Sequence, residues 1–134
     1  MIVAVHALIG AALGRYCRTP RQAALVGFAS HLVADLIPHR DLEVPKEAAL
    51  VALALGLVGA TQGFDSREFA GAVGATAPDA ENGVAWVFDI PDEKLLLPTH
   101  RCCHGAKRES VAPQVVLALT CLGLLALPNR EGPP

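Results

Sequence analysis

The sequence predicts an all-α protein, a compact bundle of about five short apolar helices with a polar centre. The 134 residues are 52% hydrophobic but only 4% aromatic, and Ala, Leu, Val and Gly supply the excess. Small and aliphatic residues suit closely packed helices. Apolar runs of helical length alternate with Pro- and Gly-containing breaks. We therefore expect one helical domain over residues 1–128, followed by a disordered tail at 129–134.

The first expected helix covers residues 2–14. His6, Gly10 and Gly14 recur at four-residue spacing, so they share one face of the helix. Glycines on this face allow a neighbouring helix to approach closely. The same face should therefore bury His6.

The second and third helices are expected at residues 20–37 and 45–60. Pro20 suits the first turn of a helix, and Pro38 should end it, because the residue before a proline disfavours the helical conformation. The third helix carries no candidate ligand. Its apolar run, residues 48–60, is shorter than the roughly 20 residues needed to cross a bilayer.

A fourth helix should begin near Ser66, because Asp65 and Glu68 have capping-box spacing, and should end before Pro78. The next segment, residues 84–98, is predicted only as a short strand or an irregular wall. Its Trp86 is expected to line a pocket.

The last expected helix covers residues 111–127. It approaches the length of a membrane span but contains Pro113 and Gln114. Cys121 within it is expected to be a small core residue.

Ligand-capable side chains interrupt the apolar second helix and follow its end. His31 and Asp35 are four residues apart and therefore share one face, where Gly27, one turn earlier, leaves room. His39 and Asp41 follow at the helix exit. An imidazole and a carboxylate at this spacing can bind one Zn²⁺ ion, or can simply bond each other.

Two further polar motifs lie later in the chain. Asp79 and Glu81 belong to GATAPDAENG, residues 74–83, which can be either a helix-ending turn or a source of metal ligands. His100 and His104 share one face if their turn is helical. Between them, Cys102 and Cys103 can be reactive thiols, extra metal ligands or residues without a site role, and we favour the last interpretation.

All five histidines lie in or beside these motifs, which indicates one shared polar centre between helices. Helical bundles build metal sites from facing helices. We predict a divalent metal, most simply Zn²⁺, as one or two ions. Glu81 or His39 is the expected proton-handling group.

Four motifs, VHALIG, SHLVADLIPHRD, APDAEN and PTHRCCHG, resemble those of a metal-dependent hydrolase family associated with bacterial inner membranes, distantly similar to zinc-dependent phospholipase C. The resemblance implies an all-α fold and a set of metal ligands, namely His6, His31, Asp35, Asp79, His100 and His104. The order differs, because the HxxxD helix here precedes the PD turn.

The predicted function is metal-dependent hydrolysis of phosphoesters or lipid-like esters by a metal-activated water. The protein should be associated with the bacterial inner membrane, or cytoplasmic if soluble. A net charge of −2 indicates no nucleic-acid partner. Two alternatives stay open: a non-catalytic metal-binding or membrane-associated scaffold, and a metal-free protein with structural histidines.

Overall fold

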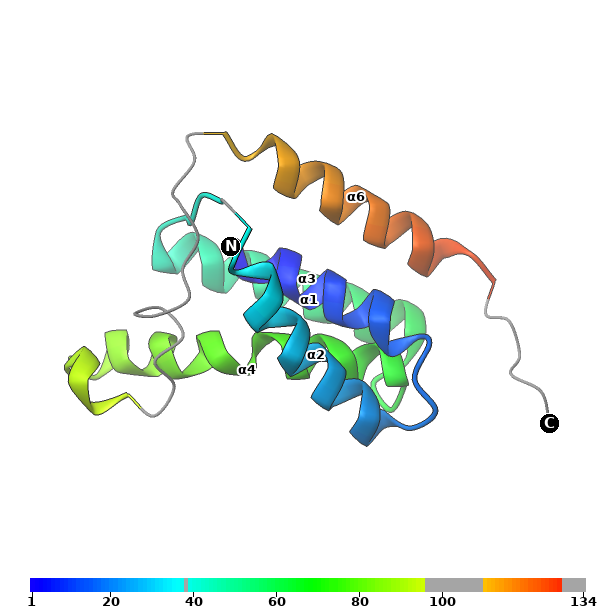
Figure 1. The fold of residues 1–134 in the computed structure, drawn as a ribbon, viewed down its shortest axis with the longest axis horizontal. Helices are drawn as coiled ribbons and strands as arrows, with labels where there is room; N and C mark the ends of the chain where they lie inside the picture. The colour runs from blue at the N-terminus through cyan, green and yellow to red at the C-terminus, as the bar shows by residue number, and fades with distance from the viewer. Residues whose placement is uncertain (38, 96–109, 129–134) are drawn as a thin grey trace.

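The computed structural model describes residues 1–37, 39–95 and 110–128, and within them it is an all-α bundle without strands, as predicted (Figure 1). The described elements are α1 (Val3–Gly14), α2 (Pro20–Ala34), α3 (Val44–Gln62), α4 (Arg67–Val87), the 3₁₀ turn η1 (Asp92–Lys94) and α6 (Ala112–Ala126).

Helix α1 is the central element, because α2, α3, α4 and α6 all pack against it. Figure 1 shows α6 along one side of α1 and α4 along the other, with α3 behind α1. The core between α1, α3 and α6 includes Leu8, Ala11, Val58, Cys121 and Leu125. The prediction that Cys121 is a core residue is therefore confirmed.

Helices α1, α2 and α4 meet almost backbone to backbone, through glycines. A Cβ atom built on Gly10 would lie 2.3 Å from the carbonyl oxygen of Gly71 on α4, and one on Gly27 would lie 2.1 Å from the same oxygen. We call these three residues, Gly10, Gly27 and Gly71, the glycine crossing. The expected small-residue face of α1 is confirmed.

The helix starts follow local capping rules. Pro20 occupies the first turn of α2, and the side chain of Thr19 accepts a hydrogen bond from the Gln22 amide. Ser66 caps α4 by accepting a hydrogen bond from the Phe69 amide. The predicted helix start near Ser66 is therefore confirmed, although the cap is Ser66 and not Asp65. The predicted extension of α2 to residue 37 is wrong, because the helix ends at Ala34.

The prediction that the fourth helix ends before Pro78 is wrong. Helix α4 runs through Pro78 to Val87, so GATAPDAENG is helical and VAWVF is neither strand nor irregular wall. Pro78 cannot donate to the carbonyl four residues earlier. Its ring, however, is fully buried, and α4 packs extensively on α1 and α2. This packing outweighs the lost hydrogen bond.

Helix α3 is longer than its apolar run suggested. With 19 residues, it is the helix among the described residues that is long and apolar enough to cross a membrane, and 17% of its apolar window is buried. The expectation that this segment is too short to cross a bilayer is therefore corrected. A helix in the core of a soluble protein can pass the same test.

Polar side chains hold the ends of α1 in place. Glu47 on α3 accepts from the amides of Val3 and Leu42, both at distances below 3 Å. Gln114 on α6 accepts from the Ile2 amide at 2.8 Å. At the other end of α1, Arg15 donates to carbonyl oxygens at the end of α6.

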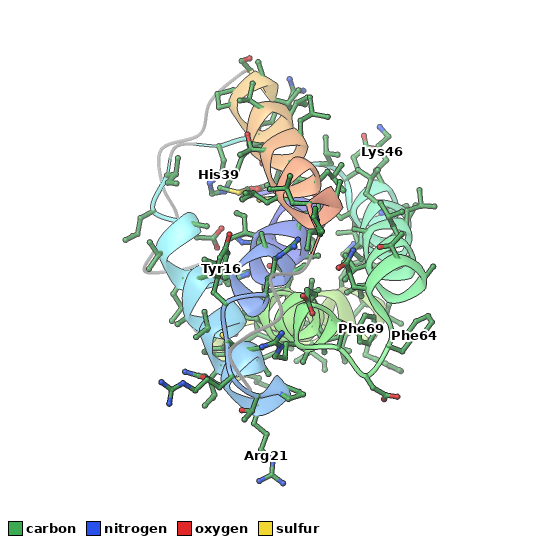
Figure 2. The ribbon with its side chains drawn as sticks, turned by 90° about the vertical axis from the view of Figure 1, so that its right-hand side faces the viewer. Tyr16, Arg21, His39, Lys46, Phe64 and Phe69 are labelled. Atoms are coloured by element: carbon green, nitrogen blue, oxygen red, sulfur yellow. The ribbon has the colours of Figure 1, made fainter. Side chains whose placement is uncertain are left out.

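Two labelled regions of Figure 2 mark the outer surface of the bundle. Arg21, in the first turn of α2, projects away from the helices. Phe64 and Phe69 lie together where α3 turns into α4, with ring centroids 5.1 Å apart in an edge-to-face contact. This aromatic pair closes the α3–α4 turn.

Candidate metal centre

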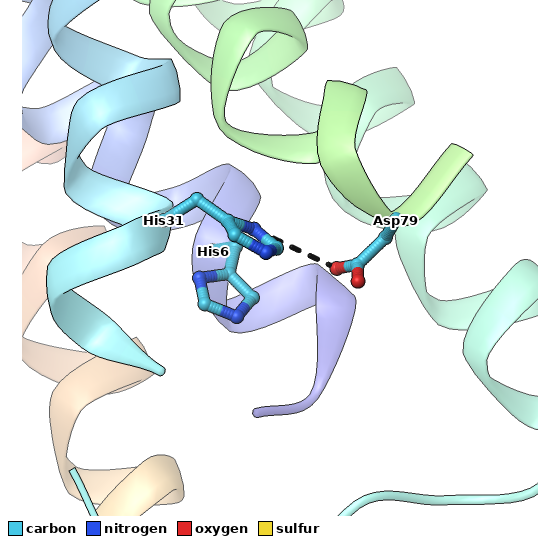
Figure 3. A group of neighbouring side chains, drawn as sticks. All are labelled: His6, His31 and Asp79. Carbon is cyan, nitrogen blue, oxygen red and sulfur yellow. Dashed lines mark ion pairs between the residues drawn. The ribbon is translucent and has the colours of Figure 1, made fainter. Parts of the chain in front are cut away.

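Three side chains from three helices meet in the interior. His6 comes from α1, His31 from α2 and Asp79 from α4 (Figure 3). Each offers a ligand atom, and these atoms all lie within 4.8 Å of one another. Both imidazoles are buried, and their rings stack with centroids 4.0 Å apart. Among the described residues, this group could hold a metal ion.

The glycine crossing explains why the three side chains meet. His6 lies one turn before Gly10 on α1, and His31 lies one turn after Gly27 on α2. Both therefore project from the same helix faces as the glycines. Asp79 lies on α4 two turns beyond Gly71. Because the backbones touch at the crossing, even short side chains beside it reach one another.

The imidazole of His31 is oriented by a backbone carbonyl. Its Nδ1 lies 2.9 Å from the Ala75 carbonyl oxygen on α4 and 3.7 Å from Asp79 Oδ2. A carbonyl only accepts, so Nδ1 donates to it. Nε2 has no hydrogen-bond partner among the described residues. A ring held through Nδ1 with Nε2 available is the common arrangement of metal-ligating histidines.

The imidazole of His6 is oriented by a carboxylate instead. Its Nε2 lies 3.0 Å from Asp35 Oδ1, whereas its Nδ1 is buried and makes no hydrogen bond to the described part of the chain. The predicted proximity of His31 and Asp35 is confirmed, since His31 Nε2 lies 3.4 Å from Asp35 Oδ2. A cation would satisfy His6 Nδ1, a buried nitrogen for which the described residues provide no hydrogen-bond partner.

The electrostatics of the site favour the forms that bind a cation. Burial lowers the pKa of His6, so its ring is neutral at pH 7. Burial alone would raise the pKa of Asp35. Interactions with His31 and His6 and the nearby Met1 amine outweigh it and hold the pKa of this carboxyl far below its usual range. Metal ligands must be deprotonated, and His6 meets that condition. The Asp35 carboxylate is ionised and can orient His6.

A second polar group adjoins Asp35. The Met1 amine lies 3.0 Å from Asp35 Oδ1 and 3.0 Å from Asp41 Oδ1. His39 Nε2 lies 3.1 Å from the same Asp41 oxygen, and its Nδ1 lies 2.7 Å from the Ile37 carbonyl. Through Asp41 and the amine, His39 is therefore linked to the centre without being one of its three candidate ligands.

The structure brings together some of the predicted site residues. His6, His31 and Asp79 converge, and Asp35 contacts both imidazoles. His100 and His104, with Cys102 and Cys103, lie outside the described residues.

Glu81 stays a predicted proton-handling group, and its place on α4 differs from that of Asp79. The two residues are about 200° apart around the helix, at 3.6 residues per turn. Glu81 therefore lies on a different side of α4 from Asp79.

Sequence reasoning missed the groups that orient the ligands. The Ala75 carbonyl is a backbone atom, so no side-chain pattern could indicate its role. Gln114, which interrupts an apolar run in the sequence, is buried and joins the Ile2 amide to the Arg40 carbonyl. A polar residue at one position of an otherwise apolar helix was the available signal.

Comparisons with protein-family models, curated proteins and solved structures found no match to this chain. The geometry of the site is therefore the basis for the function proposed below.

Proposed function

We propose that this chain is a metal-dependent hydrolase of phosphoesters or lipid-like esters, with a zinc-type ion held by His6, His31 and Asp79. One observation supports the proposal most strongly. Two buried imidazoles, each with one ring nitrogen lacking a hydrogen-bond partner among the described residues, lie beside a carboxylate within ligand distance. Three N and O ligands with an open position are the donor set of catalytic zinc sites.

The chain's own residues have separate tasks in this proposal. The ion would lower the pKa of a bound water to near 7 and polarise the ester. Asp35 orients His6 through its 3.0 Å contact, and the Ala75 carbonyl orients His31. Of the two predicted proton-handling groups, His39 is the one linked to the centre, through Asp41 and the Met1 amine. The His39–Asp41 pair has geometric support, because Asp41 lines a cleft that also reaches Asp79.

Chelation is the first test of this proposal. We expect the purified protein to contain about one Zn²⁺ per chain and to cleave a chromogenic phosphodiester or carboxylic ester. A chelator should abolish turnover and lower the melting temperature, and Zn²⁺ should restore both. If chelation lowers the melting temperature but the metal-loaded protein cleaves neither substrate, the non-catalytic scaffold is the better description. If no metal is bound and the chelator has no effect, the histidines are structural.

Association with a membrane is a second part of the proposal. Helix α3 exposes Leu50, Leu53 and Leu57, and exposed apolar patches of this kind mark membrane or protein contacts. We expect the protein in the membrane fraction of a bacterial lysate, and Leu53→Lys with Leu57→Lys should move it toward the soluble fraction. Full recovery of the unmodified protein in the soluble fraction would contradict this expectation.

A further inference from the structure

A cleft of about 400 Å³ opens beside the candidate metal centre, between the start of α1, α3 and α4. Asp79 belongs to both, because its carboxylate is a candidate ligand and it also lines the cleft. A molecule in the cleft would therefore end at the metal. This volume lies in the ordinary range of small-molecule sites.

The walls of the cleft differ in chemistry. Helix α3 contributes an apolar wall that includes Ala48, Val51 and Leu55. The acidic residue of this wall, Glu47, already accepts backbone hydrogen bonds through both of its carboxylate oxygens. Helix α4 contributes Asp79 together with Asn82. The cleft thus offers hydrocarbon contact along most of its length and polar groups beside the metal ligand.

A neighbouring hollow of about 450 Å³ extends the cleft along α4. The two share Val44 and Asn82, and Trp86 lines the second one, which confirms that Trp86 lines a pocket. Asp79 and Trp86 are seven residues apart. They therefore lie on one face of α4, about 10 Å apart along its axis at 1.5 Å per residue.

The charges of these walls discriminate between ligand classes. Among the described residues, those that line the two hollows include Asp41, Glu47, Asp79 and Asp89 but no Lys or Arg. Met1 also lines the cleft, and the charge of its amine is already paired with Asp35 and Asp41. Phosphate-rich ligands such as nucleotides require cations or amide clusters to balance their charge. The lining therefore disfavours a polyanion and favours a ligand with one small headgroup and a long apolar part.

We infer that the cleft holds a single hydrocarbon chain, running from Asp79 past Val44 and Asn82 to Trp86, with the polar ester at the Asp79 end. This inference rests on the proposed hydrolase function, which it narrows to substrates with an alkyl or acyl chain. A short water-soluble ester would fill only the end of the cleft next to the metal.

Trp86, the single tryptophan of the chain, makes the inference measurable. Alkyl phosphonates with a bromine near the end of the tail resist hydrolysis and quench a neighbouring indole. Below their micelle concentration, we expect long-tailed phosphonates to quench Trp86 fluorescence. Their affinity should rise roughly fourfold per added methylene, from about 0.8 kcal/mol per buried CH₂. Equal affinity for short and long tails, or no quenching by a long tail, would overturn the inference.

A matched pair of variants locates the bound chain. Ala48→Phe places a ring in the cleft and should weaken binding of the long-tailed phosphonate at least tenfold. Ala49→Phe adds the same ring at the next position of α3, which is exposed and does not line the cleft, and should leave binding unchanged. Equal effects of the two variants would count against this cleft.

The inference and the proposed function can fail separately. Quenching with the expected chain-length dependence but no turnover would support the hydrocarbon cleft and reject the hydrolase. Turnover of short esters without quenching by long tails would support the hydrolase and reject the cleft as a chain site. Quenching that persists in His31→Ala would show that the chain binds independently of the metal.

Discussion

Replacing His31 by Ala is expected to lower the metal content of the purified protein from about one ion per chain to nearly none. The variant loses an imidazole whose Nδ1 is held by the Ala75 carbonyl and whose Nε2 has no hydrogen-bond partner among the described residues. Removing one of three protein ligands leaves too few donors for a zinc-type site. Mass spectrometric metal analysis after dialysis measures the change.

Asp35→Ala should have the same effect on metal retention. Asp35 contacts both imidazoles and orients His6, and such supporting carboxylates commonly account for 10- to 100-fold in metal affinity. The matched control is His39→Ala, which removes a buried imidazole outside the three-residue group and should keep the metal. Wild-type metal content in His31→Ala or Asp35→Ala would refute the assigned site, as would equal loss in all three variants.

Gly27→Ala is expected to lower the free energy of unfolding by about 2 to 3 kcal/mol, the range of overpacking in a tight core. Its new Cβ would lie 2.1 Å from the Gly71 carbonyl oxygen. Because that atom belongs to the backbone, α2 and α4 must separate. His31 lies one turn from Gly27, so we also expect weaker metal retention. Denaturant unfolding and metal analysis give the two readouts.

Gly56→Ala is the matched control for the glycine crossing. Gly56 is a mid-helix glycine of α3, and a Cβ there would meet nothing within 4 Å. Alanine should therefore raise the free energy of unfolding by about 0.5 to 1 kcal/mol, as expected from helix propensity. A Gly27→Ala variant as stable as Gly56→Ala would mean that α2 and α4 are not in close contact.

Local signals predicted much of the helical framework. Pro20 and Ser66 mark helix starts because capping depends only on neighbouring residues. The helix end predicted before Pro78 was wrong. The free-energy cost of a proline inside a helix depends on neighbouring residues, whereas the packing that offsets this cost involves residues far away in the sequence. The surroundings of Pro78, buried between helices, are encoded in α1 and α2, far away in the chain.

The sequence by itself determined which residues share a helix face: His6 with Gly10, and His31 with Asp35 and Gly27. Which residues share a helix face follows from the 3.6-residue period of the helix and needs no knowledge of other segments. Only the tertiary structure decided that these faces meet, that Asp79 from α4 joins them, and that the hollow beside Asp79 adjoins the one beside Trp86. Contacts between helices depend on how backbones pack in three dimensions, and no spacing along one chain segment specifies which segment it will touch.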